Sequence, residues 1–199
     1  MKSRACLFAH ACAVLALLSA PHAPAESPAP ASPSAVPITQ VIAGTARKTG
    51  KKFLVERRVV GDVTVIGLDP DNLDYPTLLS VLELNGFSAV DDGKYVRVVP
   101  DANSRQFAGP VLTGGDGSYA SAEYVTRILS VKNVPAAMLV PVLRPLVPQN
   151  GHLVALPCAN KLILADTYAN VKRMEKIVSA LDAGGEPYTP EKCSPSTGN

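Results

Sequence analysis

Residues 74–100 read DYPTLLSVLELNGFSAVDDGKYVRVVP. The first part carries leucines at helical spacing after an aspartate-rich segment, and Gly86 follows them as glycine often follows a helix. Two β-rich runs come next, at 87–90 and 95–99, and they flank the turn sequence Asp-Asp-Gly-Lys at 91–94, which is typical of a tight hairpin. The stretch therefore predicts one helix followed by a two-stranded hairpin.

The chain before this stretch supplies the rest of a first module. Residues 38–49 place apolar side chains at helical spacing, and Gly50 follows them as a left-handed stop. Two short β-rich runs, at 52–56 and 63–68, are separated by a turn. Together with the helix and hairpin, these segments predict the order α-β-β-α-β-β over residues 38–101.

A second module is predicted over residues 123–183, with the order β-α-β-β-α. Its first helix, from Pro135 to about Pro145, should be short or kinked, because Pro141 and Pro145 each remove a backbone donor. The pattern places two helices on one face of a small sheet, so the predicted fold class is α+β with two small domains. The predicted strands are 124–131, 152–156 and 161–165, and the predicted second helix is 167–181.

The segments outside the two modules have the composition of a leader, two linkers and a tail. Residues 1–25 have a basic start, an apolar centre and the end Ala23-Pro24-Ala25, so we expect a signal peptide that is cleaved after Ala25. A retained anchor is the alternative, but the apolar run is shorter than the roughly 20 residues that a bilayer span needs. After cleavage we expect a periplasmic chain without a membrane span. The other segments are a Pro/Ala/Ser-rich linker at 26–37, a Gly/Ser linker at 102–122 and a flexible tail at 184–199.

Charge balance and residue counts argue against several classes of function. Lys and Arg total 19 against 17 Asp and Glu, and removal of Lys2 and Arg4 with the leader equalises them, so we expect no nucleic-acid partner. His152 is the single histidine after cleavage, so we expect no enzyme, no cofactor and no metal site. The aspartates between residues 69 and 74 suit turns and helix caps better than a calcium loop, because no glycine or distal glutamate follows them at the required spacing.

Several short motifs, taken in order, resemble two domains of one protein family. The runs TGKKFLV at 49–55 and VVGDVTV at 59–65 make residues 38–101 look like the N-zero domain of type II secretion secretins, the general secretion pathway protein D family. The runs KNVPAA at 132–137 and NKLILAD at 160–166 make the second module resemble the KH-like N-one domain that follows N-zero in that family.

This resemblance implies a non-catalytic docking component of type II protein secretion. In the family, these domains line the periplasmic vestibule beneath the outer-membrane pore, and N-zero contacts the inner-membrane clamp protein and incoming exoproteins. The expected partners are therefore that clamp protein, a secretin or other copies of this chain, and exoprotein cargo. Because the sequence ends soon after the second module, we expect no pore-forming core. A truncated secretin remnant and a periplasmic signalling or receptor module are the alternative functions.

The first module also separates its charges along the chain. Residues 47–58 contain six basic residues and a single acid, Glu56, whereas the following stretch up to Asp92 contains acids and no basic residue. This pattern has two readings, solvated surface or a docking face that steers a partner.

The predicted docking edge follows from a departure from the family. N-zero domains usually open with a strand, but Pro33 and Pro37 disfavour one here because proline cannot donate to a ladder. The strand at 63–68 would then keep an unpaired edge, to which an extended partner segment could add. The predicted partner-binding residues are Val63, Thr64, Val65, Ile66, Lys51, Lys52, Arg57 and Arg58.

Two cysteines remain after cleavage. Cys158 lies between two predicted strands of the second module and Cys193 lies in the tail, in a compartment that favours oxidation. A disulfide between Cys158 and Cys193 and a pair of free thiols are both open, and we take the disulfide as the prediction to test.

Overall fold

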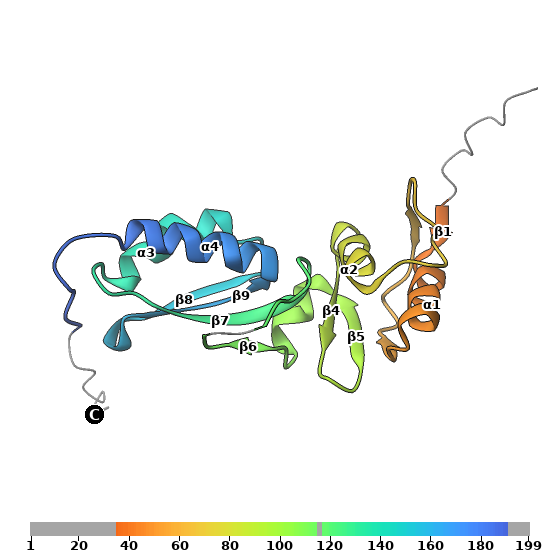
Figure 1. The fold of residues 1–199 in the computed structure, drawn as a ribbon, viewed down its shortest axis with the longest axis horizontal. Helices are drawn as coiled ribbons and strands as arrows, with labels where there is room; N and C mark the ends of the chain where they lie inside the picture. The colour runs from red at the N-terminus through yellow and green to blue at the C-terminus, as the bar shows by residue number, and fades with distance from the viewer. Residues whose placement is uncertain (1–34, 115–116, 191–199) are drawn as a thin grey trace, which may run out of the picture. The chain divides into compact units, whose positions relative to one another are not determined.

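The computed structural model describes residues 35–114 and 117–190. The predicted signal peptide with its cleavage site, most of the segment 26–37 and Cys193 lie outside these residues. Helices and strands are mixed along the chain (Figure 1). The buried hydrophobic side chains form two separate clusters. The predicted α+β class is thereby confirmed. We call residues 35–100 the first module and residues 111–181 the second module.

The first module has two helices and five strands. Its sheets are a two-stranded pair, β1-β3, and a three-stranded sheet of order β2-β5-β4, in which β2 runs parallel and β4 antiparallel to β5. The elements are β1 (Ala35–Pro37), α1 (Ile38–Thr49), β2 (Phe53–Val55), β3 (Asp62–Thr64), α2 (Tyr75–Leu84), β4 (Phe87–Asp91) and β5 (Val96–Pro100).

Helix α1 occupies the predicted residues, and its ends follow from the sequence. Gly50 has a φ of 70° and donates its amide to the carbonyl of Ala46, which is the left-handed cap that glycine adopts without strain. At the α2 start, the side chain of Asp74 accepts from the amide of Thr77 at 2.9 Å, as an N-cap residue does.

The core of the first module lies where α1 and α2 meet. Ile38, Val41, Leu78 and Leu82 are buried there together with side chains from β3, β4 and β5. Gly44 lets α1 approach the loop before α2, because a Cβ at this position would lie 2.5 Å from the carbonyl oxygen of Asp71. A larger residue at position 44 would therefore push the helix and the loop apart.

The prediction that no strand precedes α1 was wrong. Residues Ala35–Pro37 form β1, which pairs antiparallel with β3 so that Val36 lies opposite Val63. Only alternate residues of a strand bond to a given neighbour, so an edge strand can end on a proline. The pairing then continues beyond Pro37 through the amide of Ile38, which donates to Gly61 at 3.0 Å.

The predicted strand at 63–68 was too long. The structure limits β3 to Asp62–Thr64, and residues 65–68 belong to the loop that leads to α2. Gly67 has a φ of 74°, which an extended strand does not accommodate. The β-branched run that suggested a longer strand therefore continues past its end.

The second module has a four-stranded sheet of order β6-β7-β9-β8 with two helices on one face (Figure 1). Strand β6 comes from the predicted Gly/Ser linker at 102–122, which also contains all but the first residue of the 3-10 helix η1 (Asp101–Gln106), so part of this linker is regular structure. The elements are β6 (Val111–Leu112), β7 (Tyr124–Ser130), α3 (Ala136–Leu143), η2 (Arg144–Leu146), β8 (His152–Leu156), η3 (Pro157–Ala159), β9 (Lys161–Thr167) and α4 (Tyr168–Leu181).

A buried amide fixes the start of α3. Asn160 is the one described non-glycine residue with a positive φ, at 45°, and its side chain is buried. Its amide nitrogen donates to the carbonyls of Val131 at 2.7 Å and Val134 at 3.0 Å. Its side-chain oxygen accepts from the amide of Ala136 at 2.7 Å. One side chain thus joins the end of β7, the start of α3 and the β8–β9 turn.

Candidate functional site

The structure divides the predicted docking strand between the core and the surface. Val63 is buried and Val65 packs against the core, whereas Thr64 and Ile66 are exposed. One edge of β3 is paired with β1, so the predicted missing partner strand is present. The edge of β3 that faces away from β1 has no further strand among the described residues. An open edge is therefore present, but it belongs to a strand pair that already contains β1.

Large apolar side chains are exposed on both sides of β3 in the chain. Val60 keeps 68% of its surface exposed and Ile66 keeps 78%, and Leu68 is exposed as well. We call residues 60–68 the β3 segment. An exposed cluster of apolar residues in a short segment is typical of a protein-binding surface, although single exposed residues are not. Val60 and Leu68 were missed from the sequence, and their position beside the turn glycines Gly61 and Gly67 was the available signal.

The basic residues of the first module are mostly paired with acids of the same module. Arg47 contacts Asp71 at 3.3 Å, Lys51 contacts Asp91 at 2.7 Å, and Arg58 contacts Glu56 at 2.5 Å. The acidic and basic stretches that separate along the sequence therefore partly neutralise each other in space. Lys52 and Arg57 are exposed and have no ion pair among the described residues. Of the four predicted basic docking residues, these two are available to a partner.

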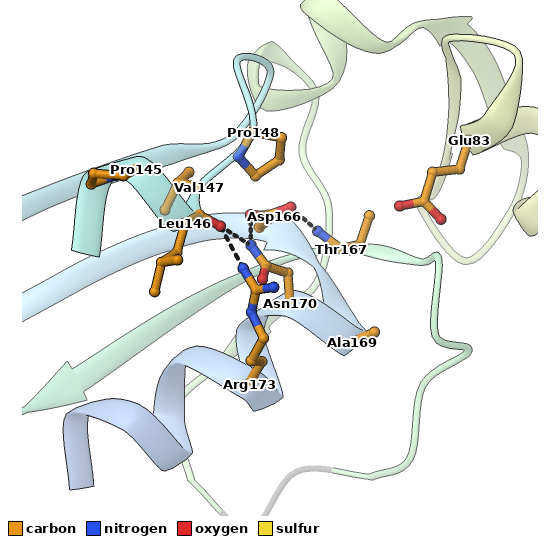
Figure 2. Close-up of a pocket in the computed structure, with 10 residues that line it drawn as sticks. All are labelled: Glu83, Pro145, Leu146, Val147, Pro148, Asp166, Thr167, Ala169, Asn170 and Arg173. Carbon is orange, nitrogen blue, oxygen red and sulfur yellow. Dashed lines mark hydrogen bonds between the residues drawn. The ribbon is translucent and has the colours of Figure 1, made fainter. Parts of the chain in front are cut away.

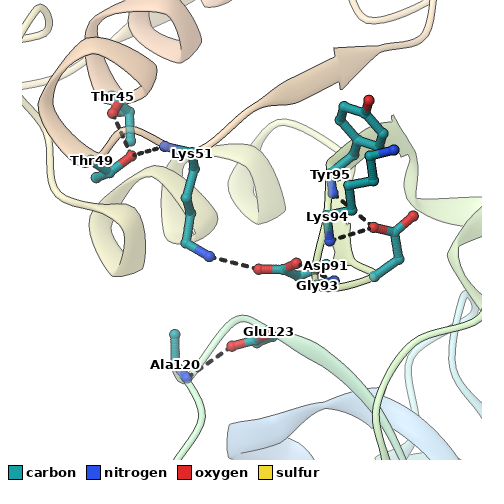
Figure 3. A network of polar contacts seen from close by, with 10 residues as sticks. Thr45, Thr49, Lys51, Asp91, Gly93, Lys94, Tyr95, Ala120 and Glu123 are labelled. Atoms are coloured by element: carbon teal, nitrogen blue, oxygen red, sulfur yellow. Dashed lines mark hydrogen bonds and ion pairs between the residues drawn. The ribbon is translucent and has the colours of Figure 1, made fainter.

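Lys51 lies in a network that holds the first module together (Figure 3). Its ammonium also sits 4.5 Å from the ring centroid of Tyr75, which adds a cation–π contact to the ion pair with Asp91. The second oxygen of Asp91 accepts from the amide of Gly93 at 2.8 Å in the β4–β5 turn. Lys51 is therefore a structural residue, and its replacement would disturb the module as well as any docking.

Three groups around this network have shifted pKa values. Burial raises the pKa of Tyr75, and the nearby carboxylates of Glu123 and Asp91 raise it further. Burial also raises the pKa of Glu123, against the effect of a hydrogen bond from the amide of Ala120. Hydrogen bonds from the amides of Tyr95 and Lys94 instead hold the pKa of Asp92 below its ordinary value. These shifts follow from packing and turn geometry.

The second module has a hollow of about 610 Å³ beside the start of α4 (Figure 2). Arg173 and Asn170 point toward the carbonyl of Leu146 and donate to it at 2.7 Å and 3.2 Å. Asn170 also donates to the buried carboxylate of Asp166, whose pKa is raised chiefly by burial. These contacts cap η2 and join it to α4, so they give Asp166, Asn170 and Arg173 a structural role; Glu83 of α2 also lines the hollow.

Two further features of the second module bear on the predictions. Cys158 is in a disulfide, while the other three cysteines lie outside the described residues, so its pairing with Cys193 stays a prediction. Asp182 accepts from the amides of Asn133 at 2.7 Å and Lys132 at 2.8 Å. Burial raises the pKa of Asp182, but these backbone hydrogen bonds outweigh it and leave the pKa below its ordinary value.

The described ranges were also searched for metal and membrane features. Within residues 35–114 and 117–190, no three His, Cys, Asp or Glu side chains gather closely enough to bind a metal ion. In the same ranges, none of the helices combines the length and the apolar character that crossing a bilayer requires.

Comparison with known proteins identifies relatives of both modules. A family described as "GspD-like, N0 domain" matches residues 34–98, and a family described as "Bacterial type II/III secretion system short domain" matches residues 126–186. The chain is 40% identical over 139 residues to the secretin XcpQ of Pseudomonas aeruginosa, which covers 69% of this chain and 20% of XcpQ. It is 32% identical over 154 residues to the secretin GspD of Vibrio cholerae, which covers 75% of this chain and 23% of GspD.

A solved structure supports the same relationship. The Klebsiella pneumoniae type II secretion system outer membrane complex, with PulD, PulS and the PulC HR domain, matches with a TM-score of 0.66 and 27% identity. The match covers 78% of this chain and 27% of that one. The chain thus spans between a fifth and a quarter of the length of the curated secretins named above.

Proposed function

Since this chain belongs to the secretin family of type II secretion systems, we propose that it is a non-catalytic docking module that works in the periplasm. Its proposed partner is the periplasmic domain of the inner-membrane clamp protein, with secretin copies and exoprotein cargo as further partners. The proposed docking surface is the β3 segment, which contains Val63, Thr64, Val65 and Ile66, together with the basic residues Lys52 and Arg57.

One observation carries this proposal: apolar side chains stay exposed on both sides of β3 in a module that the N0 family matches. Val60 and Ile66 would lose contact with water in a complex, and burial of apolar surface is the main favourable term in protein association. The solved Klebsiella complex contains the PulC HR domain together with the secretin PulD, which supports a protein partner from the same secretion system.

The strand pair gives the docking surface a second means of recognition. Because the part of the chain that the structure describes adds no third strand to the β1–β3 pair, each of these strands presents backbone groups along one side. An extended partner segment can bond to such an edge and place alternate side chains against the module. Lys52 and Arg57, which have no ion pair among the described residues, would then increase the rate of encounter with an acidic partner.

The test is a binding measurement with the full chain after leader removal and the purified periplasmic domain of the clamp protein from the same secretion system. We expect Ile66→Asp and Val60→Asp each to weaken binding by about tenfold or more, because each places a charge in the contact. Leu84→Asp is the matched control, since Leu84 is 86% exposed at the end of α2 and outside the β3 segment.

Two negative binding results would count against different parts of the proposal. If the Ile66 and Val60 variants bind the clamp domain as well as the parent chain does, the β3 segment is not the docking surface. If the parent chain itself does not bind that domain or a secretin, the docking proposal fails and the remnant alternative gains. A thermal unfolding curve for each variant distinguishes lost binding from lost folding.

A further inference from the structure

Strand β2 is an exposed edge of the three-stranded sheet of the first module. The sheet order is β2-β5-β4, so among the described residues β2 has a neighbouring strand on one side only. The carbonyl of Lys52 accepts from Val96 and the amide of Glu56 donates to Val98, each at 2.9 Å, so residues 52, 54 and 56 bond toward β5. In a parallel ladder, the backbone groups of the alternate residues Phe53 and Val55 then point away from the sheet. These groups can accept another strand.

An apolar groove lies beside this edge. It has a volume of about 430 Å³, and its walls include Leu54 and Val55 of β2 and Phe107, which follows η1. Leu54 keeps 48% of its surface exposed, although it is in the middle of a strand, while Val99 at the groove is buried. Arg97 and Gln106 contribute polar groups to the lining. We call this feature the β2 groove; it suits one apolar side chain of an extended segment.

The charge around β2 indicates which segment fits. Lys52 and Arg57 stand at the two ends of the strand, are exposed, and lack an ion pair within the described ranges. The other cations near the groove are occupied, because Arg58 pairs with Glu56 and Arg97 pairs with Asp92. Lys52 directly precedes β2 and Arg57 lies in the turn that follows it, so a segment laid along β2 can place one acid near each of its ends.

We propose that the β2 groove binds an extended segment of a partner protein that carries an apolar side chain between two acidic residues, by adding it as a strand to β2. This site uses the edge of β2 and not the β3 segment, but it shares Lys52 and Arg57 with the docking surface proposed above. The apolar side chain fills the groove, the backbone bonds to Phe53 and Val55, and the acids pair with Lys52 and Arg57.

Segments of this same chain fit the site less well. The acids Asp71, Asp91 and Asp92 already pair with Arg47, Lys51 and Arg97, so a second copy would have to break an ion pair to use them. The two ends of the sequence outside the described residues contain one acid each, Glu26 in residues 1–34 and Glu191 in residues 191–199. Neither end supplies two acids flanking an apolar residue.

The probe is a synthetic peptide of alternating leucine and threonine with one aspartate at each end, five residues apart. It is titrated into the full chain after leader removal and followed by the amide NMR signals. We expect shifts at Phe53, Val55 and Phe107, with no shifts in β8 or β9. The same peptide with lysine in place of aspartate should bind about tenfold more weakly, since its charges repel Lys52 and Arg57.

Variants of the chain and of the peptide separate the contributions of the apolar groove, the two cations and the backbone hydrogen bonds. Leu54→Asp should abolish the shifts, and the double variant Lys52→Gln, Arg57→Gln should weaken binding about fivefold to tenfold and flatten its dependence on salt. Lys161→Gln with Lys176→Gln, in the second module, is the matched control and should bind like the parent chain. A peptide methylated at alternate backbone nitrogens should bind no better than the lysine peptide, because it cannot form the added strand.

Three results would overturn the proposal. The first is equal binding of the aspartate and lysine peptides, which leaves no role for the two cations. The second is a shift of the Phe53 and Val55 signals on dilution of the chain alone, which assigns the edge to a second copy. The third is a change of the same signals on removal of residues 26–34, which assigns it to the chain itself. Unchanged signals of α1 and α2 in Leu54→Asp confirm that the first module of this variant is folded.

Discussion

The two modules complete their sheets in different ways. In the second module, β9 pairs with β7 along seven residues and with β8 along five, so both edges of β9 are hydrogen-bonded to neighbouring strands. In the first module, β1, β2 and β3 have three residues each and lie in two separate sheets. Both modules keep edge strands with exposed apolar side chains, such as Ile66 beside β3 and Leu156 in β8, but the first divides short strands between two sheets whereas the second gathers its strands in one. We therefore propose docking through the first module on the strength of its β3 segment, not on a lack of open edges in the second.

The largest expected effect is a loss of stability when the buried hydrogen bonds of Asn160 in the second module are removed. Asn160→Ala removes hydrogen bonds to Val131, Val134 and Ala136 and places alanine in a left-handed backbone conformation. We expect the free energy of unfolding of this module to fall by about 4 kcal/mol, because buried backbone groups lose their partners. Hydrogen exchange of the β9 amides measures it, and Asn72→Ala at an exposed position of the first module is the control. A loss below that of the control would contradict the role of Asn160.

The disulfide comes next. If Cys158 and Cys193 are joined, thiol labelling of denatured, unreduced chain after leader removal should find no free thiol. Reduction should then lower the free energy of unfolding of the second module by about 3 kcal/mol in the chain-entropy account, and should leave the first module unchanged. Two reactive thiols per chain would reject the pairing.

The corresponding weak point of the first module is the close approach at Gly44. Gly44→Ala places a methyl group against the backbone of Asp71, and we expect a loss of about 2 kcal/mol even though alanine favours the helix. Exchange of the α1 and α2 amides should report this loss, with the β9 amides unaffected. Gly117→Ala is the control, because a Cβ there meets nothing within 4 Å. Equal stability of both variants would mean that α1 and the loop can move apart freely.

Acid should act on the second module through Asp182. Because its folded-state pKa is lowered, this carboxylate stabilises the fold above its ordinary pKa of about 4, and the stabilisation is lost as the pH falls through the lowered value. Asp166 has a raised pKa and therefore acts with the opposite sign. We expect Asp182→Asn to cost about 1 kcal/mol at pH 7 and to make stability fall less between pH 5 and pH 3. Parallel pH profiles for the parent and the variant would exclude this account.

The smallest expected effect distinguishes two neighbouring lysines. Lys51→Gln should lower the free energy of unfolding of the first module by about 1 kcal/mol, because it removes a partly buried ion pair with Asp91. Lys52→Gln should leave stability within error, since Lys52 has no ion pair among the described residues. Unfolding curves of the two variants in low and high salt test the difference, which should shrink in high salt. The reverse order of stabilities would be inconsistent with the observed pairing.

Local signals allowed much of the fold to be predicted from the sequence. The helix 38–49 with Gly50, the hairpin around Asp91–Lys94 and the shortened helix α3 each depend on residues within a few positions of one another. Strands β1 and β6 were missed because a short strand is defined by its neighbour, and Pro37 or a glycine-rich context outweighs the local pattern. The strand at 63–68 was predicted too long because its β-branched run continues past the end of β3.

The candidate site was harder to predict than the fold. The sequence separates acids from bases, but ion pairs such as Arg47–Asp71 join residues far apart in the chain, and only the fold reveals which cations remain available. The exposure of a side chain is equally hard to predict from the sequence, because Val63 and Ile66 are both β-branched and apolar, yet Val63 is buried and Ile66 is exposed. The two available cations, Lys52 and Arg57, were thus included in the predicted set without being distinguished from Lys51 and Arg58.

Hydrogen–deuterium exchange of the full chain, with and without the periplasmic domain of the clamp protein, tests the central claim most directly. The account predicts slower exchange in the β3 segment, residues 60–68, on addition of the partner, and unchanged exchange in β7, β8 and β9. Protection confined to the second module, with the β3 segment unchanged, would contradict it.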